Sequence, residues 1–269
     1  MNSLHSLLRQ FRSLFPGWQG DVPTETTCFW QTDIHSHLVP GVDDGVSTPE
    51  QALDCLQQLA AGGIRHVITT PHVSQDWYPN TRDTLLTGLT SLRQLVADHQ
   101  LPLTIDMAAE YLVDDLFLDL LHADQLLSFG PERYVLFETG WASAPHFLNE
   151  ILFHLLAQGY QPVLAHPERY TYYHDQLKTL DELRSKGCLF QLNWGSLTGR
   201  YGRRVKTQAQ RLLRQKWVDF IGSDAHRPSD LAILPTLIAS ADYEQLRQQP
   251  LRNQSLLGLS SIPPTESLC

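Results

Sequence analysis

Histidine and acidic residues in this 269-residue chain fall repeatedly just after short apolar, β-prone runs. His35 and His37 follow the first run, and Asp224 and His226 repeat that spacing after the last one. Residues two apart in a strand point to the same side, so each pair can hold one ion. Single side chains of the same kinds follow the intermediate runs: His72, Glu110, Glu138 and His166. Imidazole nitrogens and carboxylate oxygens that converge in this way predict a multinuclear divalent metal site, which commonly performs hydrolysis.

An acidic turn at residues 40–45, with the sequence Pro-Gly-Val-Asp-Asp-Gly, follows the first histidine pair. Such a turn has an ordinary structural explanation, since glycine and aspartate favour turns. It also supplies an extra carboxylate close to the predicted metals. We favour Asp44 over Asp43 as that ligand, and the sequence leaves the choice between them open.

Two arginines stand next to predicted ligands. Arg169 lies three residues after His166, and Arg227 directly follows His226. A guanidinium can bind two phosphate oxygens at once, so both are candidates for contact with a phosphorylated substrate. The alternative for Arg169 is a salt bridge to Glu168 or another acid.

Composition excludes several other classes of protein. A net charge of −9 argues against binding to nucleic acid, which requires a basic surface. The four cysteines are far apart and form no Cys-x-x-Cys pair, which favours a reduced, cytoplasmic protein. No apolar run reaches the roughly 18 residues of a membrane span. The chain also contains no Gly-x-Ser-x-Gly nucleophile motif and no glycine-rich nucleotide loop.

Strands and helices alternate along most of the chain, which predicts an α/β fold with a parallel sheet. One helix is predicted to begin after Thr48, with Pro49 in its first turn, and another covers about residues 145–158. Seven such units fit a closed barrel slightly smaller than the common eight-unit form. The predicted strands lie near residues 32–36, 64–70, 103–109, 134–138, 162–165, 189–193 and 218–222.

The domain organisation expected from the sequence has three parts. Residues 1–30 form an N-terminal extension whose first 20 residues have helix-like apolar spacing. This helix either packs on the barrel wall or docks on a partner or membrane surface. Residues 31–257 form the metal-dependent domain, and residues 258–269 form a flexible tail.

Taken together, the motifs resemble those of the PHP (polymerase and histidinol phosphatase) superfamily. More narrowly, they are similar to the bacterial manganese-dependent protein tyrosine phosphatases of capsule and exopolysaccharide gene clusters. The resemblance covers about residues 32–240. It rests on Asp-Ile-His-Ser-His-Leu-x-Pro-Gly-x-Asp-Asp-Gly, Thr-Pro-His, Ala-Glu-Tyr, Phe-Glu, Ala-His-Pro-Glu-Arg-Tyr and Gly-Ser-Asp-Ala-His.

The resemblance implies a distorted (βα)7 TIM-like barrel, the PHP fold, with three Mn²⁺ ions at its C-terminal mouth; Fe, Zn or Mg could take the place of manganese. It assigns one metal to His35, His37, Glu110 and Asp224. A second metal takes Glu110, Glu138 and His166, and a third takes Asp44, His72 and His226.

The same resemblance implies hydrolysis of phosphotyrosine by a metal-bridging hydroxide. The predicted catalytic residues are Arg169, Asp44 and His226, and the predicted substrate contacts are Arg169, Asn193 and Arg227. The implied substrate is a tyrosine-phosphorylated protein, namely the tail of a bacterial tyrosine autokinase. The implied location is the cytoplasm, with recruitment to the inner face of the membrane by this partner, and a homo-oligomer is left open.

Two alternatives to this function remain at the level of sequence. One is a small-molecule phosphatase of the histidinol phosphatase type, and the other is a non-catalytic metal-binding scaffold. A basic cluster after the sixth predicted strand favours a phosphorylated partner, because positive charge beside the mouth would steer it there. The cluster consists of Arg200, Arg203, Arg204, Lys206, Arg211, Arg214 and Lys216.

Overall fold

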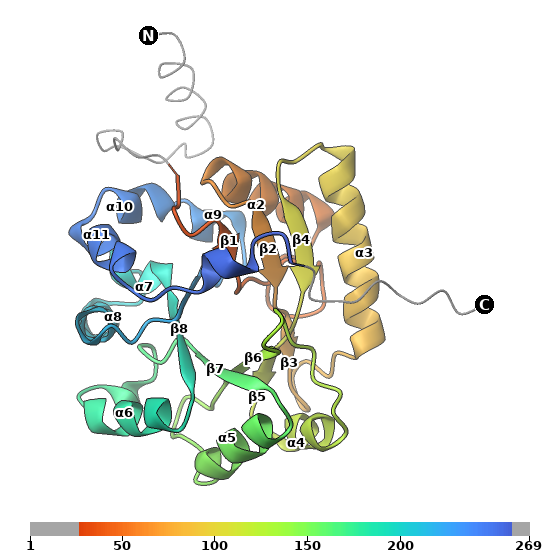
Figure 1. Cartoon of the computed structure of the whole chain (residues 1–269). Coiled ribbons are helices and arrows are strands. Elements are labelled where there is room, and N and C mark those ends of the chain that lie inside the picture. Colours follow the sequence, from red (N-terminus) through yellow and green to blue (C-terminus); the bar gives the residue numbers. More distant parts are fainter. Residues whose placement is uncertain (1–26, 260–269) are drawn as a thin grey trace.

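The computed structural model of the chain describes residues 27–259. The helix expected in the first 20 residues, and all but the first two residues of the expected tail, lie outside this part. Within residues 27–259, parallel strands stand at the centre and helices surround them (Figure 1). The fold is therefore a mixed α/β fold whose parallel strands curl into a half-barrel.

The strands form two parallel sheets. One has the order β1-β2-β4 and the other has the order β3-β5-β6-β7-β8-β9. Their bounds are β1 (Thr32–Asp33), β2 (His66–Thr69), β3 (His72–Val73), β4 (Thr104–Met107), β5 (Glu110–Leu112), β6 (Tyr134–Glu138), β7 (Gln161–Ala165), β8 (Leu189–Asn193) and β9 (Phe220–Gly222).

Each of the seven predicted strands overlaps one strand of the structure, and β2 and β4 are each followed, after a two-residue interruption, by a further short strand that was not predicted, β3 or β5. Between β2 and β3 the chain passes Pro71, which has no N–H group to donate to a neighbouring strand. Between β4 and β5 the interruption falls at Ala108 and Ala109. Each interruption lies directly before a predicted ligand, His72 or Glu110, and each ligand opens the next short strand.

The first and last strands are neighbours, as expected from the sequence. Ser36 and Ala225 form an isolated parallel bridge, and the backbone N–H of Asp224 donates to the carbonyl of His35 at 2.8 Å. Gly222 permits this approach, because a Cβ atom there would lie 2.6 Å from the Cβ of His35. This approach places two pairs of predicted metal ligands side by side: His35 and His37 after β1, and Asp224 and His226 after β9.

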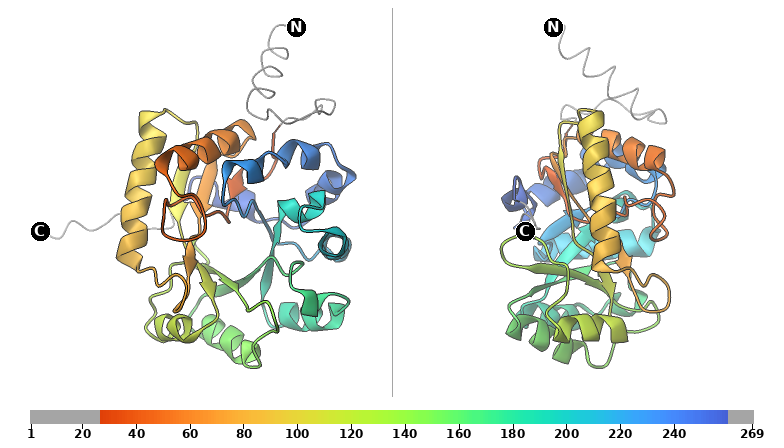
Figure 2. Two further views of the ribbon diagram at one scale, coloured as in Figure 1. Left: turned by 180° about the vertical axis from the view of Figure 1, so that it is seen from behind. Right: turned by 90° about the vertical axis from the view of Figure 1, so that its right-hand side faces the viewer.

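Helices cover the outside of the strands, as views from behind and from the side show (Figure 2). The helix expected after Thr48 is α2 (Pro49–Ala61), and the side-chain oxygen of Thr48 accepts from Gln51 N. The helix expected from about residue 145 is α5 (Leu148–Ala157), which begins three residues later. The other helices are α3 (Arg82–Asp98), α4 (Asp115–His122), α6 (Leu177–Ser185), α7 (Trp194–Thr198), α8 (Arg203–Gln215), α9 (Pro228–Leu231), α10 (Leu234–Ile238) and α11 (Ala241–Arg247), with short 3₁₀ turns η1 (Thr171–Tyr173) and η2 (Asn253–Leu256).

The buried apolar side chains lie mostly between these helices and the strands. A smaller buried cluster includes Ile34, directly after β1, together with Ile68 of β2, Leu136 of β6 and Val163 of β7. None of the helices within residues 27–259 is long and apolar enough to cross a membrane.

Candidate metal centre

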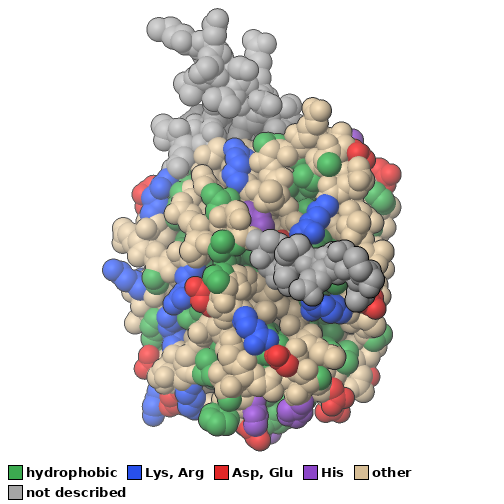
Figure 3. Space-filling view, turned by 45° about the vertical axis from the view of Figure 1, so that its right-hand side comes forward, with side chains coloured by type: hydrophobic (Ala, Val, Ile, Leu, Met, Phe, Trp, Pro, Cys, Tyr) green, Lys and Arg blue, Asp and Glu red, His purple; other side chains and the backbone are tan. Residues whose placement is uncertain are grey.

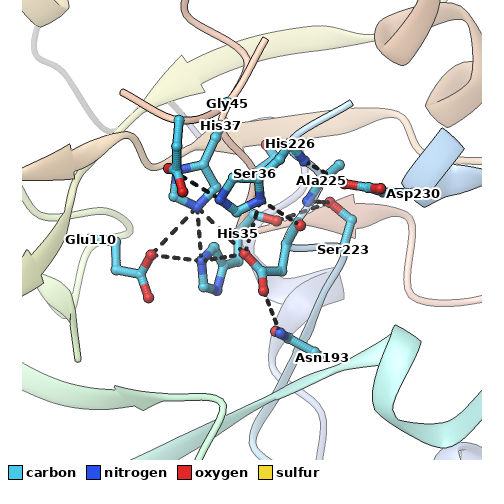
Figure 4. Close-up of polar contacts among 12 residues, drawn as sticks. His35, Ser36, His37, Gly45, Glu110, Asn193, Ser223, Ala225, His226 and Asp230 are labelled. Carbon is cyan, nitrogen blue, oxygen red and sulfur yellow. Dashed lines mark hydrogen bonds and ion pairs between the residues drawn. The ribbon is translucent and has the colours of Figure 1, made fainter. Parts of the chain in front are cut away.

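Glu110 is the central residue of a cluster of histidines and acids at the carboxyl ends of the strands. Its Oε2 lies 3.0 Å from His35 Nε2 and 3.3 Å from His72 Nδ1, while its Oε1 lies 3.0 Å from His166 Nε2. Figure 4 shows the carboxylate of Glu110 facing the imidazoles of His35 and His37. Both carboxylate oxygens are therefore shared among rings from different strands, as a bridging ligand requires.

All nine predicted ligands come together in this cluster. Within residues 27–259, their donor atoms form four overlapping groups, and the atoms of each group lie within 4.8 Å of one another. The groups are His37, Asp44, His72 and His226; His35, His37 and Asp224; His35, Glu110 and His166; and His72, Glu110 and Glu138.

The grouping of these donors differs in part from the three sets that the resemblance implied. His37 lies with the donors of the expected third metal as well as with Asp224. His166 lies with His35 rather than with Glu138, and Glu138 lies with His72. Glu110 belongs to two groups, which agrees with the bridging role predicted for it.

Two of the predicted ligands adopt an unusual backbone conformation. His166 has φ of 36° and Asp224 has φ of 53°, in the left-handed region that residues with a Cβ seldom occupy. Such conformations cost about 1–3 kcal/mol and persist only when the surroundings fix them. His166 directly follows β7 and Asp224 lies two residues after β9, and both side chains belong to the cluster.

The two acids of the turn at residues 40–45 take different positions. Asp43 has a buried side chain and accepts from His37 Nδ1 at 2.8 Å and from the backbone N–H of His72 at 3.0 Å. Asp44 is half exposed, and its Oδ1 lies 3.4 Å from His226 Nε2 and 3.6 Å from His72 Nε2. This arrangement supports Asp44 as the ligand and Asp43 as the residue that orients His37.

Three buried polar residues whose roles the sequence did not reveal hold the ligands in place. Gln191 Oε1 accepts from His35 Nδ1 at 2.8 Å, which directs the other ring nitrogen of His35 toward the cluster. Asp33 accepts from the Ser223 hydroxyl at 2.6 Å and so ties β1 to β9. Burial raises the pKa of Asp33, although these hydrogen bonds oppose the shift, and the result is a pKa of about 6.

Asn193 is also fully buried, and its amide donates to Asp224 Oδ2 at 2.6 Å. A side chain without exposed surface offers no contact to a substrate in the cavity. This conformation therefore argues against the predicted substrate contact and for a role in holding Asp224. The only available sequence signal was the pair of polar residues two apart, Gln191 and Asn193, in an apolar strand.

The electrostatics of the cluster fit a set of cations. Burial alone would lower the pKa of His35, but the negative charges of Glu110 and Asp224 raise it to about 9. Conversely, burial would raise the pKa of Glu110, yet His35 and His72 hold it well below its usual range. The acids thus retain protons on neighbouring imidazoles, and a divalent ion that binds here would displace those protons.

A cavity of about 570 Å³ opens above the cluster, within the size range of ligand sites. It is lined by every predicted ligand except His35 and His37, which are fully buried. Arg169 and Arg227 also line it, which is consistent with their predicted contact with a phosphate. Arg169 Nη1 donates to Asp224 Oδ2 at 2.7 Å, so the ion pair that the sequence left open is formed with Asp224.

Within residues 27–259, no cysteine lines the cavity. Cys28, Cys55 and Cys188 are all buried. Burial raises the pKa of Cys188 to about 12, which keeps it a thiol and a poor nucleophile at neutral pH.

Comparisons with known proteins agree with this geometry. A family model described as "Capsular polysaccharide synthesis, CpsB/CapC" matches residues 31–249. The chain is 30% identical to the tyrosine-protein phosphatase YwqE of Bacillus subtilis over 194 residues, which is 72% of this chain and 76% of the relative. It is 26% identical to the tyrosine-protein phosphatase CpsB of Streptococcus agalactiae over 214 residues, covering 78% of this chain and 87% of the relative.

A solved structure is similar over most of its length. It comes from work on YwqE of Bacillus subtilis and CpsB of Streptococcus pneumoniae, which are described there as unique metal-dependent tyrosine phosphatases. The TM-score is 0.73 at 26% sequence identity, and the match covers 84% of this chain and 90% of the other.

Proposed function

Because the chain belongs to the capsular polysaccharide synthesis CpsB/CapC family, we propose that it is a metal-dependent phosphatase acting on phosphotyrosine in proteins. The observation that carries the proposal is the arrangement of four overlapping donor groups around Glu110, at the floor of a cavity lined by Arg169. The half-barrel is proposed to derive from seven βα units, since β2 with β3 and β4 with β5 each lie near one predicted strand. The family match supports residues 31–257 as the catalytic domain.

The proposed cofactor is a cluster of three Mn²⁺ ions, and Fe, Zn or Mg could take their place. Mixed imidazole and carboxylate donors suit ions of this class. When bound, such ions neutralise phosphoryl oxygens and make water a stronger nucleophile at neutral pH. All nine predicted ligands are proposed to hold the cluster; of these, Asp44 and His226 lie nearest to solvent beside the cavity.

The chain's own residues orient the substrate. Arg169 can present part of its guanidinium to a phosphate while it remains paired with Asp224. The ring of Tyr201 lies 4.4 Å from the Arg169 guanidinium carbon and that of Trp141 lies 4.8 Å from it, which fixes the direction of the side chain. A fixed cation of this kind stabilises charge on the phosphoryl group without reorganising during the reaction.

The proposed partner is a tyrosine-phosphorylated protein, namely the tail of a tyrosine autokinase that acts at the inner face of the membrane. A cytoplasmic location is supported by the free, buried thiols of Cys55 and Cys188. Part of the predicted basic cluster lies beside the cavity. Arg200 lines it, and Arg203, Arg204 and Arg211 line a second groove of about 370 Å³.

The substrate class can be tested by comparing a phosphotyrosine peptide with histidinol phosphate. Both substrates are supplied at equal concentrations to the Mn²⁺-loaded protein, and phosphate release is measured. We expect kcat/KM to be higher for the peptide. A preference for histidinol phosphate would favour the small-molecule phosphatase, and no release from either substrate would favour the scaffold.

A further inference from the structure

Two exposed tryptophans stand at the cavity and are not explained by metal binding. Trp77 is 74% exposed and Trp141 is 53% exposed, and both line the cavity above the metal centre. By contrast, Trp30 and Trp194 are fully buried in the core. Large exposed aromatic surface is unfavourable in water, and its concentration at a concave site indicates a binding role.

The two tryptophans come from different loops. Trp77 belongs to a tight turn in which the N–H of Ser74 donates to the carbonyl of Tyr78 at 2.9 Å. The ring of Tyr78 stacks on His72, with ring centres 5.5 Å apart and planes inclined by 13°. This turn therefore places one aromatic layer on a predicted metal ligand and presents Trp77 beside it.

Trp141 is placed in a similar way, in the loop after β6. Its ring stacks on His166, with centres 5.9 Å apart and planes inclined by 9°. Tyr170 supports it further at a ring-centre distance of 5.3 Å. Aromatic rings thus lie one layer above predicted metal ligands in both loops, and the phosphate-binding candidate Arg169 touches one of them.

We propose that Trp77 and Trp141 bind the aromatic ring of the substrate tyrosine and make the enzyme selective for aryl phosphates. This inference rests on the proposed phosphatase function. A phosphate held by Arg169 is joined to the tyrosine ring by a single oxygen, so the rigid ring must leave the floor between the cavity walls. At that level the walls carry the exposed indoles, which can pack against the ring by stacking or edge contacts. An alkyl phosphate offers no such surface.

The test uses Trp77→Ala, Trp141→Ala and the matched Trp77→Phe and Trp141→Phe variants. Phe153→Ala is the control, because Phe153 is 68% exposed on α5 and does not line the cavity. For each Mn²⁺-loaded protein, KM is measured with a phosphotyrosine peptide and with phenyl phosphate. Inhibition by inorganic phosphate and bound metal content are measured on the same preparations.

Each alanine variant should raise KM for both aryl substrates by roughly 2- to 10-fold, and the phenylalanine variants should recover most of that loss. Inhibition by inorganic phosphate should not change in the Trp77 variants, since phosphate has no ring. The Trp141 variants are left out of this comparison, because Trp141 also packs against Arg169. Phe153→Ala should behave as the unchanged protein.

Unchanged KM in both alanine variants would overturn the proposal. A parallel rise in the inhibition constant of inorganic phosphate in the Trp77→Ala variant, or loss of metal from either alanine variant, would also overturn it, because the indoles would then support the metal centre rather than the ring. Failure of the unchanged protein to release phosphate from the peptide would instead contradict the proposed function.

Discussion

Arg169 and Asp224 form an ion pair in which the guanidinium Nη1 lies 2.7 Å from the carboxylate Oδ2. The other carboxylate oxygen, Oδ1, lies 3.4 Å from His35 Nε2 and 3.5 Å from His37 Nε2. The two oxygens of Asp224 thus face different partners. One points to the proposed metal side, and the other connects the cluster to the residue proposed to hold the phosphate.

Arg169→Ala should lower kcat/KM for phosphorylated substrates without loss of metal. The amide of Asn193 still donates to Asp224 Oδ2 at 2.6 Å, so the carboxylate remains oriented. A charged hydrogen bond left unmade costs about 1.5–3 kcal/mol, or about tenfold to a hundredfold in kcat/KM. Arg169→Lys should recover only part of this, because lysine keeps the charge but loses the planar fork. A metal-depleted Arg169→Ala protein would show that Arg169 mainly positions Asp224.

Glu110→Ala should be among the most damaging single substitutions. Its two oxygens contact His35 and His72 on one side and His166 on the other, so its loss disrupts two donor groups. Asp44→Ala should be milder, since Asp44 belongs to one group and its side chain is 55% exposed. Turnover and metal per protein are measured for both variants. Near-normal values for Glu110→Ala would show that no bridging carboxylate is needed at this position.

Gln191→Leu should lower metal affinity although Gln191 is not a predicted ligand. Without its Oε1, His35 Nδ1 loses its acceptor, and the ring is free to change tautomer or orientation. Loss of a partner that orients a ligand typically costs 10- to 100-fold in metal affinity. Competition with a chelator of known affinity measures the change. Gln191→Glu keeps the acceptor and should retain more affinity, and equal affinities in the two variants would contradict this role.

The basic groove gives a prediction about the protein substrate. Arg203→Gln together with Arg204→Gln should raise KM for a multiply phosphorylated tail and reduce its dependence on salt, because exposed charges act through screened attraction. Turnover of a small aryl phosphate should not change. Arg200 is left intact, since it lines the main cavity and pairs with Asp230.

The matched control for the groove is Arg214→Gln, near the far end of α8. Figure 3 shows one face of the molecule, on which basic and acidic side chains are interspersed. If Arg214→Gln raises KM for the phosphorylated tail as strongly as the double variant does, net charge rather than the groove explains the rise in KM.

The positions of the ligands were largely predictable from the sequence. An apolar run followed at once by histidine, aspartate or glutamate marks the point where a buried strand reaches the mouth. This pattern located His35, Glu110 and Asp224, and the structure brings them together. The adjacency of the segments after β1 and β9 was also expected, because the first and last strands of a barrel are neighbours when the barrel closes; Ser36 and Ala225 form a parallel bridge there.

Other features depend on contacts between distant segments, which spacing in one sequence does not encode. The breaks before β3 and β5 arise where strand pairing changes from one sheet to the other. Asn193 was predicted to touch substrate, yet it is covered and holds Asp224. Whether Asp43 or Asp44 faces the cavity depends on the path of the turn beside His37. Nothing in the sequence around Trp77 and Trp141 indicates that both side chains line the same cavity.

The cluster is proposed to hydrolyse phosphotyrosine with bound divalent metal. The most direct measurement is phosphate release from a phosphotyrosine peptide before chelation, after complete removal of metal, and after re-addition of Mn²⁺. Cys188→Ser serves as a parallel control, because the buried thiol takes no part in the proposed chemistry. We expect activity to disappear with the metal and to return with Mn²⁺, equally in both proteins. Full activity in protein shown to be free of metal would contradict metal-dependent hydrolysis by this cluster.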